Sequence, residues 1–352
     1  MPNKRPCIAV DAMGGDSGPQ VTVPGAVQAA RETGISVCLI GDEPALAAEL
    51  EKLDAAGLDV RIVHAPQVAG MQDKPSEVLR RKKDCSIQVA MRLVKDGDAD
   101  GVVSAGNSGA TMACGMFVLG RIDGVERPAL AGIMPTAKNP VVMIDVGANV
   151  DSKPSHLFQF ALMADVFVEH VFGVDDPKVG LLSIGEEEGK GNVQVRDAYE
   201  MLRDSSVNFL GNVEGRDIFG GDVDVVVCDG FVGNVALKLS EGLAMSIATI
   251  LRRELTSDMR GRMGAKLCEP NLRRFKKNLD YAEYGGAPLL GLKGIVIVCH
   301  GASNAKAIKN AVKMAATFVE NKANKDLAAR LEANKEFTRH HKPAANNGNR
   351  AE

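Results

Sequence analysis

The sequence has 352 residues, of which 45% are hydrophobic, a net charge of −3 and a pI near 6.1. This length allows one large domain or two smaller ones with a sizeable core. The small net charge excludes a chain that attracts nucleic acid through overall positive charge. The absence of Trp and an aromatic content of 4% argue against a base-stacking surface.

The seven cysteines are odd in number and include no CxxC pair. Four of them fall in apolar, strand-like runs, which favours buried, unreactive thiols in a reducing cytoplasm, and no metal-ligand spacing is present. The apolar run at the N-terminus is too short for a signal peptide. No stretch approaches the roughly 20 apolar residues that cross a bilayer, so we expect a protein that does not span a membrane.

Short β-branched runs alternate with longer helical patterns along the chain. The runs predict strands at residues 7–10, 37–40, 60–63, 101–104, 130–134, 141–145, 179–184, 224–228 and 294–299. The helical patterns include residues 74–95, 155–172, 191–204 and 303–320. This alternation predicts an α/β fold with a mostly parallel, buried sheet.

The chain divides into two parts by composition. Residues 1–320 contain no internal repeat, and we expect them to form a single α/β domain. Residues 321–352 are polar, rich in Asn and poor in large apolar residues. One helix is expected within 325–337, and the last dozen residues are expected to be disordered.

Ligands in an open α/β sheet bind at the carboxyl ends of the strands. Six predicted strands are followed by turns rich in Gly, Asn, Ser and Asp, at residues 11–19, 105–111, 145–151, 185–192, 229–238 and 300–304. Glycine lets the backbone approach a ligand closely, and the helix starts offer unpaired N–H groups that favour an anion. Any βα connection needs one such turn, but six together predict a single crevice lined with amide donors.

The turn GEEEGKGN (185–192) indicates which anion is expected. It is not a Walker A loop, because three residues separate Gly from GK and Gly191 stands where Ser or Thr is required. No GxGxxG follows a strand, so a bare phosphate is favoured over a nucleotide. Lys190 could meet that phosphate, with Glu186, Glu187 and Glu188 keeping it charged. The alternative is a solvated lysine beside surface acids.

Six segments in the same order carry a family resemblance. They are VDAMGGD (10–16), SAGNSGA (104–110), IDVGANVD (144–151), GEEEGKGN (185–192), DGFVGNVALK (229–238) and CHGASN (299–304). Over roughly residues 6–320 the chain closely resembles the bacterial acyl-[acyl-carrier-protein]:phosphate acyltransferases of phospholipid synthesis. Ser108, where Thr is expected, and Gly189, where a larger residue is usual, remove no charge and no amide donor.

The resemblance implies a Rossmann-like three-layer α/β/α sandwich, similar to that of phosphotransacetylases and usually dimeric. It implies reversible transfer of a fatty acyl group from acyl carrier protein to inorganic phosphate. A downstream membrane acyltransferase then takes the acyl phosphate for phosphatidic acid synthesis. By resemblance, Lys190 and Asn234 fall on the positions expected to act in the site.

The chemistry of these residues agrees with that reaction. A thioester is already activated, so phosphate can attack it directly and no enzyme nucleophile, metal or cofactor is required. The site has to hold a dianion, stabilise an oxyanion and help the thiolate leave. Lys190 can pair with phosphate, and Asn234 can donate to phosphate or oxyanion. Backbone amides expected to complete the cradle lie around Gly14, Gly15, Asn107, Ser108 and Gly109.

Several other residues of these turns have alternative roles. Asp11 and Asp16 could orient the lysine or cap the following helix. His300 could protonate the leaving thiolate, or be a structural histidine bonded to backbone. Asn149, with Asp145, could bind substrate or only order its turn. The remaining candidates are Cys228 and Cys299, which could be nucleophiles, although their apolar neighbours favour burial.

Residues 243–277 form a basic segment with apolar residues at helical spacing, which predicts a projecting amphipathic helix pair. The cations expected to make contacts are Arg252, Arg253, Arg260, Arg262 and Lys266. Three interpretations compete: a solvated basic face, docking of the acidic acyl carrier protein, and peripheral attachment to an anionic membrane. We expect a cytoplasmic, peripherally membrane-associated protein, and the family resemblance implies a homodimer.

Three other functions compete with this one. A phosphotransacetylase-type enzyme would use an acyl-coenzyme A, and a lipid-surface scaffold would bind phosphate only incidentally. A nicotinamide-dependent dehydrogenase is disfavoured by the missing dinucleotide fingerprint. The basic segment favours a protein or membrane partner, and therefore the first function. The sequence does not define the acyl-chain length or the order of substrate binding.

Overall fold

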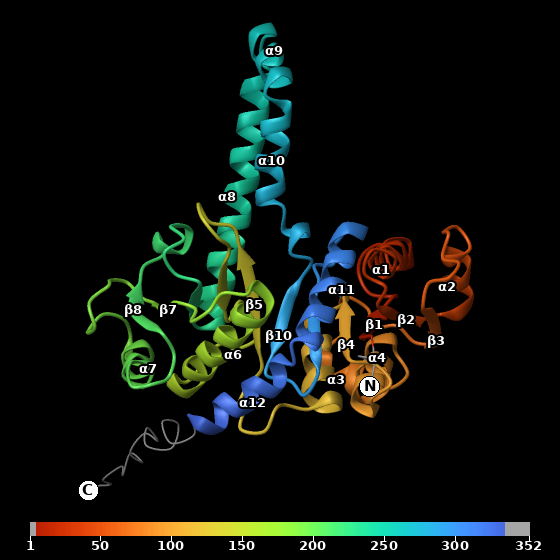
Figure 1. The fold of residues 1–352 in the computed structure, drawn as a ribbon, viewed down its shortest axis with the longest axis horizontal. Helices are drawn as coiled ribbons and strands as arrows, with labels where there is room; N and C mark the ends of the chain where they lie inside the picture. Colours follow the sequence, from red (N-terminus) through yellow and green to blue (C-terminus); the bar gives the residue numbers. More distant parts are fainter. Residues whose placement is uncertain (1–4, 335–352) are drawn as a thin grey trace, which may run out of the picture.

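The structure is a computed structural model that describes residues 5–334, apart from the side chains of Leu279 and Tyr281 (Figure 1). The strands are β1 (Cys7–Asp11), β2 (Ser36–Gly41), β3 (Val60–His64), β4 (Gly101–Ser104), β5 (Ala129–Met134), β6 (Val141–Ile144), β7 (Val179–Leu182), β8 (Phe209–Val213), β9 (Val225–Val227), β10 (Ala287–Leu290) and β11 (Ile295–Val298).

The helices are α1 (Pro19–Thr33), α2 (Glu43–Leu50), α3 (Pro75–Arg81), α4 (Ser86–Asp96), α5 (Ser108–Cys114), α6 (Pro154–Phe172), α7 (Val193–Arg203), α8 (Gly230–Thr256), α9 (Met259–Leu267), α10 (Glu269–Leu279), α11 (Ala305–Glu320) and α12 (Ala323–Ala333). A π-helical turn, η1 (Gly115–Leu119), continues α5, and the short 3₁₀ turns are η2 (Asp217–Phe219) and η3 (Tyr281–Glu283).

The strands form one 11-stranded sheet in the order β3-β2-β1-β4-β11-β10-β5-β6-β9-β7-β8. All nine predicted strands are present. The two strands that were not predicted are β8, whose Gly211 and Asn212 are depleted in strands, and the four-residue β10, which contains Pro288. The predicted helical segment 74–95 is divided into α3 and α4.

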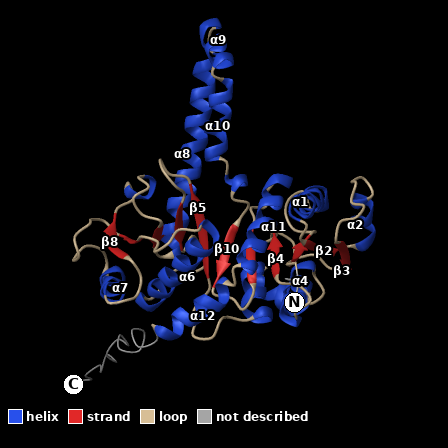
Figure 2. Cartoon of the chain, viewed as in Figure 1, coloured by secondary structure: helices blue, strands red, loops and turns tan. Residues whose placement is uncertain are grey.

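Alternate residues of each buried strand pack against different helical layers. Ile8 and Val10 belong to a core that includes residues of α1, α6, α7, α11 and α12. Cys7 and Ala9 face the opposite core, with residues of α3, α4 and α5. Beyond β5 this second face is covered by α8. The predicted three-layer α/β/α sandwich is therefore confirmed, and Figure 2 shows helices on both sides of the strands.

Strand direction reverses across the middle of the sheet. β1, β2, β3, β4 and β11 are mutually parallel. From there β10, β5 and β6 each run antiparallel to the preceding neighbour. β6, β9, β7 and β8 are again mutually parallel. After three reversals, the β6 set runs opposite to the β1 set.

The basic segment projects from the sandwich as predicted. α8 leaves the body, α9 forms the tip and α10 returns beside α8 (Figure 1). α8 begins at Gly230, earlier than predicted, because it starts directly after β9. Contrary to expectation, α8 is long and apolar enough to cross a membrane by length and composition alone, and its most apolar part is not buried in the body. One such helix is weak evidence for a span.

The predicted C-terminal helix corresponds to α12, which packs against the body beyond residue 320. Leu327 and Leu331 are buried in the same core as α6. Arg330 pairs with Asp165 and Glu169 of α6 and, at 3.0 Å, with Asp326. Residues 335–352 of the predicted tail lie outside the described residues.

Replacing Arg330 with Ala is expected to lower the free energy of unfolding by roughly 1–3 kcal/mol at pH 8. Burial raises the pKa of Asp165 to about 6, although Arg330 opposes this rise. Without Arg330 the pKa of Asp165 rises further. The variant is then stable only while Asp165 is protonated, and it loses stability as pH rises through this pKa. The loss measured by urea unfolding should therefore be smaller at pH 5 than at pH 8. Equal losses at both values would contradict this account.

Candidate functional site

The six amide-rich turns lie in two groups at opposite edges of the sheet. The carboxyl ends of antiparallel strands point to opposite edges, and the β6 set runs opposite to the β1 set. The prediction of one crevice within a single chain is therefore wrong. We call residues 145–152, 185–194 and 229–234 the Lys190 edge, and residues 11–18, 104–109 and 299–304 the Asp11 edge.

Hydrogen bonds join the three turns of the Lys190 edge. The Asp229 carboxylate accepts from the Ser152 backbone N–H at 2.8 Å and also from the Phe231 N–H at 2.8 Å, at the start of α8. The Gln194 side chain of α7 donates to the Ser152 carbonyl. The Asn234 amide donates to the Val146 carbonyl at 3.1 Å. These bonds fix the turns that carry Lys190 and Asn234 relative to each other.

Two glycines allow α8 to contact the 145–149 turn directly. A Cβ on Gly230 would lie 2.1 Å from the Asn149 carbonyl oxygen, and one on Gly233 would lie 1.9 Å from that of Asp145. No side chain fits at either position without movement of the backbone. The amino end of α8, where N–H groups lack intrahelical partners, is thus held against this turn.

Asp145 organises the turn that contains Asn149. It is fully buried, and its two oxygens accept from four backbone N–H groups between Leu130 and Asn149. The Asn149 side-chain amide donates to Asp145 at 3.0 Å and to the Pro128 carbonyl at 2.8 Å. The geometry thus supports the alternative in which Asn149 orders its turn.

Lys190 is exposed at the end of a tight turn. Its N–H donates to the Glu187 carbonyl at 3.0 Å, and Asn212 donates to the same carbonyl at 2.9 Å. Glu186 pairs with Arg216 at 3.3 Å, and Glu188 pairs with Arg203 at 2.8 Å. The expected pairing of these glutamates with Lys190 is therefore not found. Within residues 5–334 Lys190 has no ion pair, so its ammonium is available to an anion.

The Asp11 edge is built around a buried carboxylate. The Ser104 hydroxyl donates to Asp11 at 2.7 Å and accepts from the Gly106 N–H at 3.1 Å. The Asp16 N–H donates to the Gly301 carbonyl at 2.9 Å, which joins the first and last turns of this edge. One oxygen of Asp11 and the hydroxyl of Ser303 are buried without a protein partner among the described residues.

Glycines keep this edge compact. Gly15 has a φ of +90°, and a Cβ there would lie 3.1 Å from the Gly301 carbonyl oxygen. A Cβ on Gly14 would lie 2.7 Å from the Gly106 nitrogen. Ser108 and Gly109 are the first residues of α5, where backbone N–H groups have no intrahelical partner. These amides remain candidates for an anion.

Asn107 has a different position from the one expected. Its side-chain oxygen caps α5 by accepting from Ala110 N–H at 3.0 Å. Its amide donates to the carbonyls of Met71 and Asp73, both at 3.0 Å. Asn107 therefore holds the 70–73 loop against the edge instead of facing a ligand. This loop was not predicted to join the site, because nothing in its sequence shows that it packs there.

Asp11, Asp16 and His300 also differ from some of their expected roles. Asp11 and Asp16 lie at the edge opposite to Lys190, and the N-cap residue of α1 is Gly18, which supplies no side-chain cap. Neither the orientation of Lys190 within one chain nor capping by these residues is therefore found. His300 is exposed, and its Nδ1 accepts from Ala302 N–H at 3.1 Å, as expected for a histidine bonded to backbone.

Cysteines do not supply a nucleophile to either edge. Burial raises the pKa of Cys299 to about 12 and that of Cys228 further. Six cysteines are buried as predicted, whereas Cys268 between α9 and α10 is exposed. Within residues 5–334 no group of three or more His, Cys, Asp or Glu side chains could hold a metal ion.

Comparisons with known proteins identify the family. A family model described as fatty acid synthesis protein matches residues 7–326. The chain belongs to this family. A phosphate acyltransferase of Nitratidesulfovibrio vulgaris is 62% identical over 336 residues, covering 95% of this chain and 97% of that one. A phosphate acyltransferase of Geobacter sulfurreducens is 55% identical over 331 residues, covering 94% and 95%. As a member of the fatty acid synthesis protein family, this chain is an acyltransferase.

Solved structures support the fold of the family member. A phosphotransacetylase from Streptococcus pyogenes superposes with a TM-score of 0.65 at 18% identity, covering 90% of this chain and 95% of that one. The EutD phosphotransacetylase from Staphylococcus aureus gives a TM-score of 0.62 at 18% identity, covering 90% and 94%. At this identity the likeness shows a shared fold, as the sequence resemblance predicted.

Replacing Gly233 with Ala is expected to destabilise the protein by roughly 1–3 kcal/mol, because the new Cβ overlaps the Asp145 carbonyl. A Cβ on Gly242 in the same helix would have nothing within 4 Å, so Gly242→Ala is the matched control. The control should gain about 0.5–1 kcal/mol from helix propensity. Urea unfolding compares the two, and equal effects would show that the contact of α8 with the turn is absent.

Replacing Asp11 with Asn is expected to stabilise the protein at pH 8 by an amount of order 1 kcal/mol. Burial raises the pKa of Asp11, although hydrogen bonds from Ser86 and Ser104 oppose this. The parent therefore loses stability as pH rises through that pKa, and the variant does not. The difference in thermal midpoint should shrink as pH falls from 8 toward 5. A variant that is less stable than the parent at pH 8 would contradict a raised pKa for Asp11.

Proposed function

We propose that this chain transfers a fatty acyl group from acyl-[acyl-carrier-protein] to inorganic phosphate, reversibly, giving acyl phosphate for phospholipid synthesis. Membership of the family supports acyl transfer to phosphate. The observation that carries the proposal is the bonded Lys190 edge, where a lysine without an ion pair within residues 5–334 precedes α7, whose Gln194 is linked through Ser152 to Asp229 at the amino end of α8. Such an arrangement suits a small dianion.

The reaction needs no enzyme nucleophile. A phosphate oxygen attacks the thioester carbon, a C–O bond forms, the C–S bond breaks, and the carrier thiol takes the proton that hydrogen phosphate releases. Lys190 holds the phosphate by charge, and the Asn234 amide, which donates one N–H to the Val146 carbonyl, donates its second N–H to phosphate or oxyanion. The amides at the start of α8 add fixed donors, which act strongly where water is excluded.

We propose that a homodimer completes each site. Val150, Ile184 and Phe231, all on or next to the turns of the Lys190 edge, are 63%, 83% and 61% exposed. An apolar group of this kind beside a polar site is typical of a surface that another chain covers. A second copy on this surface would bring its own Asp11 edge to the Lys190 edge. Each site would then take turns from both copies.

The projecting helices α8, α9 and α10, which we call the hairpin, support a membrane-facing role. Met259, Met263 and Leu267 on α9 are exposed at 72%, 63% and 82%. Arg260, Arg262 and Lys266 lie on the same nine-residue helix. Cations that flank apolar side chains suit an anionic membrane, and the acidic acyl carrier protein could dock on the same charges, including Arg252 and Arg253 of α8. The enzyme would be cytoplasmic and peripheral, passing acyl phosphate to a membrane acyltransferase.

Lys190→Ala is expected to lower kcat/KM for phosphate by roughly 10²–10³-fold, because the charge that holds the attacking dianion is lost. Lys238→Ala is the matched control, since Lys238 is exposed on α8 and pairs with Glu241 at 2.8 Å. Activity is measured as labelled acyl phosphate formed from radiolabelled phosphate and long-chain acyl carrier protein. Unchanged activity in Lys190→Ala would show that Lys190 does not hold the attacking phosphate. The same assay with acyl-coenzyme A distinguishes the phosphotransacetylase-type alternative, which predicts a preference for the coenzyme.

Reversing the charges of Arg260, Arg262 and Lys266 to Glu is expected to abolish sedimentation with anionic vesicles, since each basic residue near the surface contributes about 1 kcal/mol. The control reverses three exposed lysines of the body, Lys52, Lys83 and Lys138. Retention of vesicle binding by the hairpin variant would exclude this segment as the membrane contact.

A further inference from the structure

A buried histidine lies where α6 follows directly on a turn of the Lys190 edge. The last residue of that turn, Ser152, bonds Asp229 and Gln194, which belong to the two other turns of the edge. The next residue, Lys153, is the N-cap of α6, and its backbone N–H donates to Nδ1 of His156 at 3.1 Å. His156 therefore holds the backbone next to the residue that joins the three turns.

Both ring nitrogens of His156 have a protein partner, and together the partners define its protonation state. Nδ1 accepts the Lys153 N–H, so this nitrogen carries no proton. Nε2 lies 3.1 Å from a carboxylate oxygen of Glu126. Because an ionised carboxylate can only accept a hydrogen bond, Nε2 is the nitrogen that carries the proton. The geometry thus requires the uncharged imidazole with its proton on Nε2.

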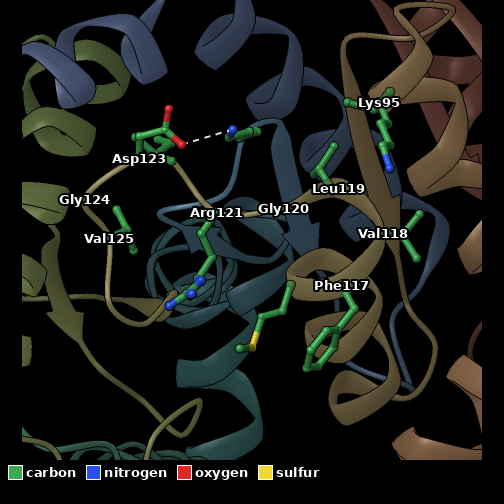
Figure 3. Close-up of a pocket in the computed structure, with 13 residues that line it drawn as sticks. Lys95, Phe117, Val118, Leu119, Gly120, Arg121, Asp123, Gly124 and Val125 are labelled. Carbon is green, nitrogen blue, oxygen red and sulfur yellow. Dashed lines mark ion pairs between the residues drawn. The ribbon is translucent and has the colours of Figure 1, made fainter.

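The backbone of Glu126 is itself held on both sides. Its N–H donates to the side-chain oxygen of Gln159 on α6 at 2.9 Å, and Arg121 bonds its carbonyl. This arginine belongs to the loop 120–125, which lines a pocket of about 620 Å³ (Figure 3). The residue that orients the imidazole of His156 is therefore fixed relative to the helix that carries it.

His156 stands at a helix position where Glu or Gln is the usual residue. In a capping box, the third residue of a helix accepts a hydrogen bond from the backbone N–H of the N-cap residue, and Glu or Gln supplies the acceptor. α6 has this bond, but an imidazole accepts it. A Gln would accept at any pH, whereas an imidazole accepts only while Nδ1 is free of a proton. The histidine therefore makes this bond dependent on pH.

The surroundings of the ring favour its uncharged form. Burial lowers the pKa of His156 below its ordinary value, the Glu126 carboxylate opposes this fall, and the charges of Lys153 and Arg127 add to it. These charged groups lie in the loop before β5 and at the start of α6. On α6 itself the ring of Phe160 lies 6.2 Å from the imidazole and carries no charge. The acceptor on Nδ1 is thus present at neutral pH and is lost in acid.

We propose that His156 is a positioning residue for the Lys190 edge, acting through its uncharged Nδ1 on the Lys153 backbone. This rests on the proposed function of that edge. His156 contacts neither phosphate nor thioester. It keeps Ser152 in the place where it joins the turns that carry Lys190 and Asn234. When Nδ1 gains a proton, the Lys153 N–H loses its acceptor, and the three turns are no longer held in one arrangement.

Two variants at position 156 test the proposal in the labelled acyl phosphate assay at pH 8. His156→Gln keeps an acceptor for the Lys153 N–H and is expected to retain kcat/KM for phosphate within about twofold. His156→Leu removes the acceptor and is expected to lower kcat/KM about tenfold or more, because small misplacements of catalytic groups are costly. Parental activity in His156→Leu, or an equal loss in both variants, would overturn the proposal.

The pH dependence distinguishes positioning by the uncharged ring from a purely structural role. The ratio of kcat/KM in His156→Gln to that in the parent should rise as pH falls through the pKa of His156, because only the parent loses its acceptor. Taking the ratio cancels the titration of phosphate itself. His170→Gln is the matched control near the other end of α6, where His170 contacts Asp326 at 3.1 Å, and its ratio should stay constant. A constant ratio for His156→Gln would overturn the proposal.

Nitrogen NMR of protein labelled with ¹⁵N-histidine supplies the pKa and tests the tautomer without any assay of activity. The signals of His156 are identified by their loss in His156→Gln, and at pH 8 they should show a proton on Nε2. A proton on Nδ1 at pH 8 would overturn the proposal.

Hydrogen exchange separates the failure of this proposal from that of the proposed function. Exchange at the Lys153 N–H should be faster in His156→Leu than in the parent and in His156→Gln. Equal exchange in all three proteins would overturn the proposal. A chain that makes no acyl phosphate would reject the proposed function, and the exchange rates would still decide whether His156 holds this backbone.

Discussion

The reversal of strand direction between β11 and β6 is the constraint on which the rest of the structure depends. β10 and β5 are antiparallel strands between two parallel sets, and they reverse the direction of the second set. Because βα turns follow the carboxyl ends of strands, the reversal sends three amide-rich turns to each edge. A single protomer thus presents two separate groups of turns, and we propose that an isologous dimer combines them.

The Lys190 edge shows how a cation is kept available in an acidic turn. Glu186 and Glu188 pair with Arg216 and Arg203 rather than with Lys190. Asn212 bonds the Glu187 carbonyl of this turn, and Gln194, which follows the turn, bonds the Ser152 carbonyl of the neighbouring one. Gly233 lets α8 approach the neighbouring turn, and the Asn234 side chain follows directly. Lys190 therefore supplies the charge at this edge, and other residues fix the positions of the turns.

Much of the fold followed from local pattern. The buried strands are continuous apolar runs, so nine were predicted, and each turn was recognised by its Gly, Asn and Asp residues. β10 was missed because it is only four residues long and contains Pro288. The separation of the turns was missed for a different reason: the direction of β6 relative to β11 is set by pairing with β5 and β10, which local periodicity does not encode. The role of Asn107 was missed for a similar reason, because the carbonyls that it bonds lie about 35 residues away in the sequence.

The most direct test of the two-copy site is complementation between two inactive variants. Lys190→Ala disables one edge, and Gly15→Val disables the other, because its Cβ crowds the Gly301 carbonyl at a φ of +90°. A heterodimer purified with two different tags contains one site with both defects and one intact site. We predict that it recovers about half of the parental activity. A heterodimer as inactive as either variant homodimer would show that each site is built from a single chain.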